Sequence, residues 1–460
     1  MSSSTDVLDR AEQADPPPQR SAGWSALRPL VLRLHFYAGL LIAPFLLVAA
    51  TTGLLYAASY QIERIVYAHE LTAPPGGPNL PLERQVAAAR AAHPKAPVTA
   101  VRPAAEPGET TRVLLDAPGL PASTQLAVFV DPSTAQVRGS LESYGSSGAL
   151  PVRAWISHLH RNLHLGEPGR LYSELAASWL WVVALGGLLL WAGRRRRKGA
   201  RLRRLTTPER GVTGRRRVLS WHGSIGLWAV VGLLFLAATG LTWSKYAGDN
   251  VDRLRVTLGW TTPSIATGGE HAAHTASPGG HRHGGGDVGP DQAVRAAAGR
   301  GLSGPLEIVW PGKAGEPYLV KESDKTWPQR LDQVAVDPAT GQVRAELRFA
   351  GFPLAAKLTR WGIDGHQGLL FGLANQIVLM LLATGVITMI VLGYRMWWSR
   401  RPNLAGYPRG AWRGVNRAVL AAFVLVAGAV GYFMPLLGIS LCAFLLLDVV
   451  LGRLLAGRRG

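Results

Sequence analysis

The stretch HGSIGLWAVVGLLFLAATGL, residues 222–241, is an almost unbroken apolar run that opens with a histidine. A second stretch, HFYAGLLIAPFLLVAATTGL at residues 35–54, opens in the same way. In both stretches glycine follows the histidine at +4 and +18, and threonine follows it at +17. Each run is long enough to cross the ~30 Å hydrocarbon layer of a bilayer as a helix. The shared positions predict that the two helices are copies of one another.

The composition favours a membrane protein throughout. Only 17% of the 460 residues are charged and 48% are hydrophobic, whereas soluble domains carry about 25% charged residues. Apolar segments of spanning length lie at 30–57, 173–193, 218–244 and 368–394, and 415–455 has the length of a hairpin of two more spans. We therefore expect an all-α transmembrane bundle of about six helices in the lipid bilayer of the cytoplasmic (cell) membrane.

The net charge of +20 is unevenly distributed along the chain. Arginines crowd the short connections 194–217 and 395–414, which the positive-inside rule places in the cytoplasm. Both termini then lie in the cytoplasm, the polar segment 1–29 is a disordered tail, and the long connections 58–172 and 245–367 lie outside. Because topology explains the basic residues, no nucleic-acid partner is expected.

The two outer connections also resemble each other. VFVDPSTAQVRGSL (128–141) reappears as VAVDPATGQVRAEL (334–347), an offset of 206 residues, and each copy has the alternating apolar pattern and Asp-Pro turn of a hairpin. When His160 is laid on His366, leucine follows both at +3 and glycine at +6. The chain thus reads as a tandem parallel repeat with two small extracytoplasmic α+β domains, related by an approximate two-fold axis along the membrane normal.

The repeat places histidines at equivalent positions. His35 and His222 lie near the cytoplasmic ends of their spans, and His160 and His366 lie near the outer ends of theirs. If each pair meets across the axis, its two imidazoles suit the axial ligation of a b-type haem, which gives haem b twice per chain. The only cysteine, Cys442, lies in the last span, which excludes thiolate metal sites and c-type haem attachment. Taken singly, each histidine also fits an ordinary interfacial residue.

The segments LHFYAGL, LHRNLHLGEPGR, WHGSIGL and DGHQGLLFG resemble those of the PepSY-associated transmembrane (PepSY_TM) family, often described as iron-regulated membrane proteins. The resemblance implies that each outer domain is PepSY-like and that the bundle holds two b-type haems, as in members that reduce ferric siderophores. His35, His160, His222 and His366 fit this pattern. In HLHRNLH, the neighbours His158 and His164 are alternatives to His160, which the internal alignment favours.

We therefore expect a transmembrane electron-transfer protein, a haem-dependent ferric reductase for iron acquisition. The inner haem would accept electrons and the outer one would deliver them to a ferric chelate outside. No flavin or nicotinamide fingerprint is visible, so the donor is external: a flavoprotein, a soluble reductant or membrane quinol. Candidate partners of the haem propionates, with lipid phosphates as the alternative, are Arg33, Arg161, Arg170 and Arg360.

Two other function classes remain open at this point. The doubled architecture also suits a non-redox membrane transporter, which would bind no haem. It would handle copper if the His-rich insert 271–286 held metal through its four histidines, His271, His274, His281 and His283. The third hypothesis is a binding or regulatory protein whose PepSY-like domains engage a peptidase or another envelope partner.

Overall fold

The structure, a computed structural model, describes residues 24–74, 76–196, 206–265, 287–313, 315–399 and 415–457. It divides into two compact units. The first, here called the helical unit, comprises residues 1–46, 175–237 and 388–460, and the second, the sheet unit, comprises 47–174 and 238–387. The helices α1, α5, α7 and α11 each run from one unit into the other.

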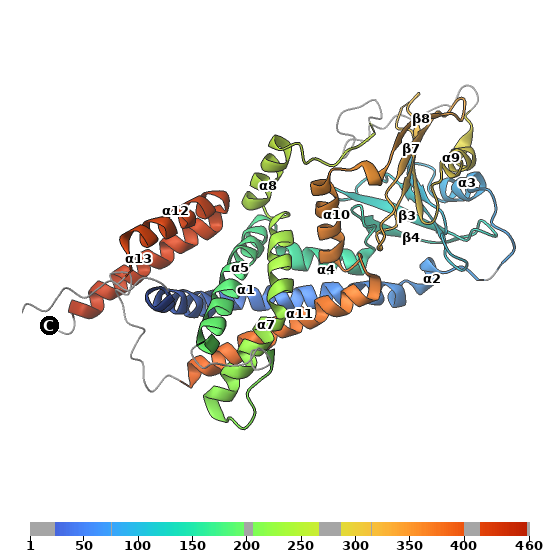
Figure 1. Ribbon diagram of the computed structural model, residues 1–460. Helices are drawn as coiled ribbons and strands as arrows, with labels where there is room; N and C mark the ends of the chain where they lie inside the picture. Colours follow the sequence, from blue (N-terminus) through green and yellow to red (C-terminus); the bar gives the residue numbers. More distant parts are fainter. Residues whose placement is uncertain are drawn as a thin grey trace, which may run out of the picture. The chain divides into compact units, whose positions relative to one another are not determined.

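Among the described residues, four helices are long and apolar enough to cross a membrane. These helices are α1 (Trp24–Val66), α5 (Glu167–Arg196), α7 (Gly214–Leu241) and α11 (Gly372–Trp398) (Figure 1). They coincide with the first four apolar segments of the sequence. The helices α12 (Arg417–Phe433) and α13 (Pro435–Gly457) are apolar as well, but their apolar stretches are shorter than the other four. The chain is thus a membrane protein with four candidate spans.

The strands of the two outer connections form one continuous antiparallel sheet rather than two. Its order is β4-β3-β2-β1-β5-β6-β7-β8. The two halves meet where β1 pairs with β5, with Ala100 opposite Val309 and Val101 opposite Ile308. The strands are β1 (Val98–Arg102), β2 (Thr111–Leu115), β3 (Thr124–Val130), β4 (Val137–Tyr144), β5 (Leu306–Val309), β6 (Tyr318–Glu322), β7 (Gln333–Val336) and β8 (Val343–Leu347). The two predicted α+β domains therefore share a sheet.

The hairpins predicted from the duplicated motif are confirmed as β3–β4 and β7–β8. An aspartate opens each turn: Asp131 accepts a hydrogen bond from the backbone N–H of Ser133 at 2.8 Å, and Asp337 accepts one from Ala339 at 2.7 Å. Such side-chain-to-backbone bonds are the reason aspartate favours turns. The Asp-Pro motif therefore encodes the turn directly.

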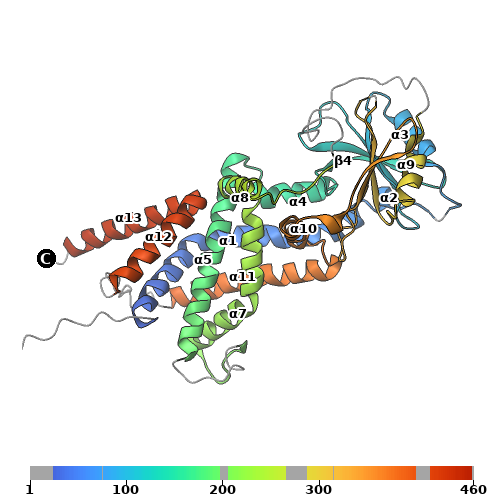
Figure 2. The ribbon, with the colours of Figure 1, turned by 45° about the horizontal axis from the view of Figure 1, so that its top comes forward.

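Helices cover the sheet and continue from its strands. On one face α3 (Leu82–Ala92) and α9 (Gly289–Ala298) lie side by side (Figure 2) and bury apolar residues such as Val86 and Ala293. After β4 the chain enters α4 (Pro151–Asn162), and after β8 it passes a short 3-10 turn, η1 (Phe349–Gly351), into α10 (Leu354–Gln367). The remaining helices are α2 (Ala68–Leu71) and α8 (Tyr246–Thr257).

A buried ion pair attaches α4 to α1 within the sheet unit. The carboxylate of Glu63 accepts hydrogen bonds from Arg153 Nε at 2.9 Å and Nη2 at 3.1 Å. It also accepts one from the backbone N–H of Leu150 at 2.8 Å, immediately before α4 begins. Both side chains of the pair are less than a tenth exposed. Because α4 carries His160, this pair fixes the helix that presents that histidine.

Replacing Glu63 by alanine should destabilise the protein strongly. The change leaves the Arg153 guanidinium buried without its carboxylate, which typically costs about 3–5 kcal/mol. We expect a clear fall in the melting temperature, measured by intrinsic fluorescence of the protein in detergent. Glu167→Ala removes the exposed pair with Lys245 and should leave the melting temperature nearly unchanged. Equal melting of the two variants would show that Glu63 does not anchor α4.

Candidate functional site

In the helical unit the structure brings His35 of α1 and His222 of α7 together. Their ring centres lie 6.4 Å apart and their planes make an angle of 77°. Two imidazoles that share one metal ion have ring centres roughly 6 to 6.5 Å apart, because each metal–nitrogen bond is about 2 Å long. The two metal–nitrogen bonds do not fix the angle between the ring planes, so an angle of 77° is compatible with a shared metal ion. The spacing therefore fits one metal centre between the rings.

Hydrogen bonds to neighbouring helices fix the tautomer of His35 and His222, called the inner pair after their predicted place near the cytoplasm. His35 Nδ1 lies 3.0 Å from the backbone carbonyl oxygen of Val183 on α5, and His222 Nδ1 lies 3.0 Å from that of Met389 on α11. A carbonyl oxygen only accepts, so each Nδ1 carries the proton and donates. A neutral imidazole of this tautomer keeps its Nε2 lone pair available. Metal-ligating histidines are usually held by such a bond.

In the sheet unit His160 of α4 and His366 of α10 have threonine partners instead. Thr52 Oγ1 lies 2.9 Å from His160 Nδ1, and Thr239 Oγ1 lies 2.7 Å from His366 Nδ1. The Thr52 hydroxyl donates its own hydrogen to the carbonyl of Val48 at 2.8 Å. It therefore accepts from His160, whose Nδ1 is protonated and whose Nε2 is left with the lone pair.

Aromatic side chains pack against the rings of His160 and His366, called the outer pair after their predicted place near the outside. The ring of Tyr56 stacks on His160, with centres 6.3 Å apart and planes 19° apart. The indole of Trp243 meets His366 edge-on at 5.3 Å. The histidines of both pairs are half-buried, so each residue keeps some exposed surface. An axial ligand requires this, since its free nitrogen must face its metal.

Burial makes both outer histidines neutral at physiological pH. It lowers the pKa of His160 from 6.5 to about 4. Burial also lowers the pKa of His366, to about 3, and repulsion from a charged His160 adds to this effect. Neutral imidazole is the form that binds a metal ion.

Two glycines allow close packing against the histidine rings. A Cβ added at Gly187 of α5 would lie 3.0 Å from Cε1 of His35, and one added at Gly53 of α1 would lie 3.1 Å from Cε1 of His160. Both distances are tighter than ordinary van der Waals contact. A side chain at either position would push the imidazole away from its hydrogen-bond acceptor.

The comparison with known families agrees with this arrangement. A family model described as the PepSY-associated TM region matches residues 32–400, a range that contains both histidine pairs and the whole sheet. The chain belongs to this family. A search of curated protein sequences finds no significant match. Within this PepSY-associated chain, α12 and α13 lie beyond the matched region.

The structure separates His160 from its two neighbours in this PepSY-associated protein. His158 packs on Tyr144, with ring centres 4.6 Å apart. His164 places its Nε2 3.0 Å from the backbone carbonyl of Trp155. Of the three histidines, His160 is the one that lies beside Thr52 and interacts with His366.

The arginines that the sequence suggested as propionate partners all contact protein groups. Arg33 forms an ion pair with Asp448, and Arg161 donates to the Tyr144 hydroxyl at 3.0 Å. Arg170 lies 3.4 Å from Glu167, and Arg360 lies 2.7 Å from Asp364. The pairing of these arginines with haem propionates stays a prediction.

The His-rich insert with His271, His274, His281 and His283 lies outside the described residues. Within the part of the chain that is described, no group of three or more His, Cys, Asp or Glu side chains is arranged to hold a metal ion. Zinc sites use three or four protein ligands. Each histidine pair offers two imidazoles, a set that matches the two axial positions of a haem iron.

Sequence reasoning missed the hydrogen-bond acceptors of the histidines, although one signal was present. Thr52 and Thr239 are the threonines at +17 in the two apolar stretches. Their partners are histidines of other helices, which spacing along a single helix does not reveal. The carbonyls of Val183 and Met389 stand 206 positions apart, the same offset as His160 and His366, but a backbone oxygen leaves no trace in a sequence.

The lowered pKa values of His160 and His366 predict that the haem-free protein loses stability in acid. Each pKa is 6.5 when unfolded, so the stability is fully present above pH 6.5 and falls as the pH drops from there towards 4 and 3. Within this window each histidine should lower the free energy of unfolding by about 1.4 kcal/mol per pH unit.

Melting temperatures at pH 7 and pH 5 test this dependence. The double variant His160→Leu/His366→Leu should show a smaller difference between the two pH values than the parent. His69→Leu, at a side chain that is 68% exposed, should behave like the parent. An unchanged pH dependence in the double variant would contradict the assignment.

Proposed function

We propose that this chain is a di-haem b transmembrane electron-transfer protein that reduces an extracytoplasmic ferric chelate. The carrying observation is the inner pair, His35 and His222, with ring centres 6.4 Å apart and both Nδ1 atoms hydrogen-bonded to carbonyls. His160 and His366 have the same kind of bond at Nδ1, with threonine hydroxyls in place of carbonyls. When bound, haem supplies a one-electron carrier at each pair.

The residues of the chain would prepare each site before any haem arrives. The Nδ1 bonds hold the rings in the neutral tautomer with Nε2 available, so ligation needs no loss of a proton. Gly187 lets the ring of His35 pack closely on α5, and Gly53 lets the ring of His160 pack closely on α1. Tyr56 and Trp243 restrict the outer rings. Such fixed surroundings reduce the rearrangement that accompanies a change of charge on the metal.

The internal repeat gives the proposal its direction. The pairs His35/His222 and Thr52/Thr239 are each separated by 187 residues. The pairs Val183/Met389 and His160/His366 are each separated by 206 residues. We infer two parallel copies around one axis, with the inner pair at the cytoplasmic side and the outer pair at the outer side of the cell membrane. The α12–α13 hairpin would complete a bundle of six spans, with both termini in the cytoplasm.

His160 and His366 belong to the same compact unit as the sheet, which we take to be the outer domain. The helices α4 and α10 follow directly on β4 and η1. The loop between β6 and β7 also contacts the turn that follows α10, where the backbone N–H of Trp327 donates to the carbonyl of Leu370 at 2.8 Å. A ferric chelate bound on this domain would lie on the same unit as His160 and His366. One electron from the outer site would convert its iron(III) to iron(II).

The visible absorption spectrum of the purified protein tests the proposal. We expect reduced b-type bands and two haems per chain. His35→Leu and His366→Leu should each remove one haem, because each variant leaves one pair intact, and the double variant should remove both. His69→Leu serves as the control and should keep two. A folded protein without haem would overturn the proposal in favour of a transporter or a binding protein.

Thr52 should strengthen haem binding although it touches no haem itself. Thr52→Val removes the acceptor of His160 Nδ1, and loss of such a supporting bond typically costs about 10–100-fold in metal affinity. Thr51→Val is the matched control, because the Thr51 hydroxyl bonds only the carbonyl of Leu47 on its own helix. The rate of haem dissociation, measured as transfer of haem to apomyoglobin, should be higher than in the parent for Thr52→Val and unchanged for Thr51→Val. Equal rates in the two variants would contradict the role of Thr52.

A further inference from the structure

In the helical unit, α13 packs against α1 and α5 through specific contacts. The indole N–H of Trp179 on α5 donates to the Ser440 hydroxyl at 2.8 Å. Arg33 forms an ion pair with Asp448, and the rings of Tyr37 and Phe444 lie 5.8 Å apart. Since α13 lies outside the matched family region, these contacts add an element to the common core.

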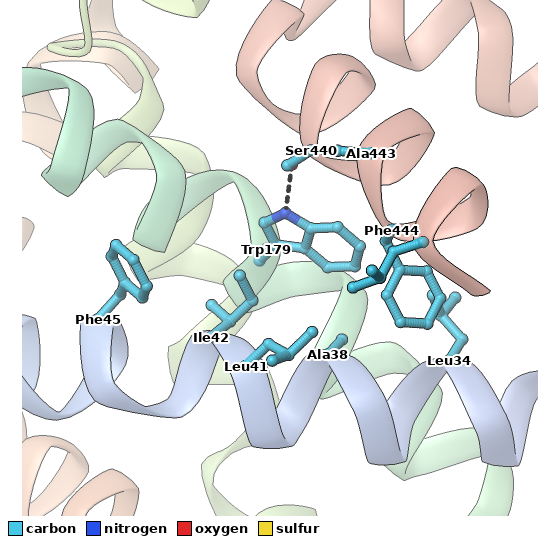
Figure 3. Close-up of a pocket in the computed structure, with 10 residues that line it drawn as sticks. Leu34, Ala38, Leu41, Ile42, Phe45, Trp179, Ser440, Ala443 and Phe444 are labelled. Carbon is cyan, nitrogen blue, oxygen red and sulfur yellow. Dashed lines mark hydrogen bonds between the residues drawn. The ribbon is translucent and has the colours of Figure 1, made fainter. Parts of the chain in front are cut away.

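A cavity of about 290 Å³ lies between these helices (Figure 3). Its walls are apolar side chains, including Ala38 and Ile42 of α1 and Ala443 of α13, and the rings of Trp179 and Phe444 face it. The polar side chain in its lining is Ser440. Small-molecule sites of about 300–1,000 Å³ with apolar walls and few polar groups are common, so this cavity has the size of a compact ring system.

The cavity is lined by α1, which carries His35, and by α5, which supplies the hydrogen-bond acceptor of His35. Leu34 and Ala38, which line it, flank His35 on α1. On α5, Trp179 precedes by about one helical turn the residue Val183, whose carbonyl accepts the hydrogen bond from His35. An occupant of the cavity would therefore lie beside the segment of α1 that carries His35.

We propose that this cavity binds the head group of an isoprenoid quinol and that this quinol supplies the electrons. The inference rests on the proposed function. Apolar walls on membrane-spanning helices favour a lipid-soluble donor, because burying the phosphates of a nucleotide there without partners is costly. A flat quinol ring also matches the two aromatic side chains of the cavity, Trp179 and Phe444.

Ser440 is suited to recognise the quinol hydroxyl. Its hydroxyl donates to the carbonyl of Leu436 at 2.6 Å and accepts from Trp179. A hydroxyl oxygen has two lone pairs, so one is left to accept the O–H of a quinol. An acyl chain of a phospholipid has no group that would use this acceptor.

Oxidation of the quinol balances with the one-electron chemistry of the inner site. Both O–H bonds break, the quinol becomes a quinone, and two protons pass to water. The two electrons would leave one at a time through the inner site, and each would reduce one ferric ion of the external chelate to iron(II).

Binding of decylubiquinone and of a short-chain menaquinone to the full-length protein in lipid nanodiscs tests the site directly. We expect saturable binding of at least one, weakened at least tenfold by Ala443→Trp, which fills the cavity. Ala429→Trp makes the same change at an exposed position of α12 and should bind like the parent. Ser440→Ala, which is small enough to preserve packing, should weaken binding several-fold. Absence of saturable binding, or equal binding by all four proteins, would overturn the proposal.

Reduction kinetics separate this inference from the proposed function. Dithionite should reduce the haem fully in the parent and in both cavity variants. The corresponding short-chain quinol, at a concentration that does not saturate the site, should reduce it at the same rate in the parent and in Ala429→Trp, and more slowly in Ser440→Ala and Ala443→Trp. If dithionite reduces the haem of the parent protein and the quinol does not, the quinol site is overturned and the electron-transfer function stands. A protein without haem would overturn the function, and the binding measurement would still decide whether the cavity takes a quinone. Phospholipid that no quinone displaces would overturn the site.

Discussion

An imidazole on a membrane helix has two ring nitrogens, and the partner of one decides what the other is free to do. At each of the four histidines the Nδ1 atom is hydrogen-bonded to an oxygen on a neighbouring helix, from Val183, Met389, Thr52 or Thr239. His35 and His222 lie on candidate membrane spans, where hydrocarbon supplies no competing water, so such a bond is strongly preferred there once the helices pack. It orients the ring and leaves the Nε2 lone pair available, and the packing of the glycines and aromatic side chains around the rings depends on this orientation.

Each of the two units contains one histidine pair together with a surface suited to exchange. The helical unit combines His35 and His222 with an apolar cavity beside α13. The sheet unit combines His160 and His366 with an eight-stranded sheet. Under the function proposed above, the helical unit would take up electrons from a lipid-soluble donor and the sheet unit would release them to a water-soluble acceptor.

The continuous sheet also has a mechanical consequence. Since β1 pairs with β5, and Arg102 crosses the junction to Glu307 at 2.7 Å, the halves of the outer domain are held in one register. The sheet leads into α4 on one side and α10 on the other, and Glu63 ties the start of α4 to α1. The relative position of His160 and His366 is therefore constrained through the sheet as well as through the membrane helices.

The sequence by itself determined the membrane class, four spans, both hairpins and the family, because these depend on local patterns: runs of apolar residues, Asp-Pro turns and motifs repeated at constant offsets. It also singled out His35, His222, His160 and His366 as candidates. Tertiary structure decided which groups meet. Pairing of β1 with β5, the carbonyls of Val183 and Met389 as acceptors, and the packing of α13 against α1 involve residues far apart in the chain. Backbone atoms and helix–helix distances carry no residue code, so only the folded arrangement reveals them.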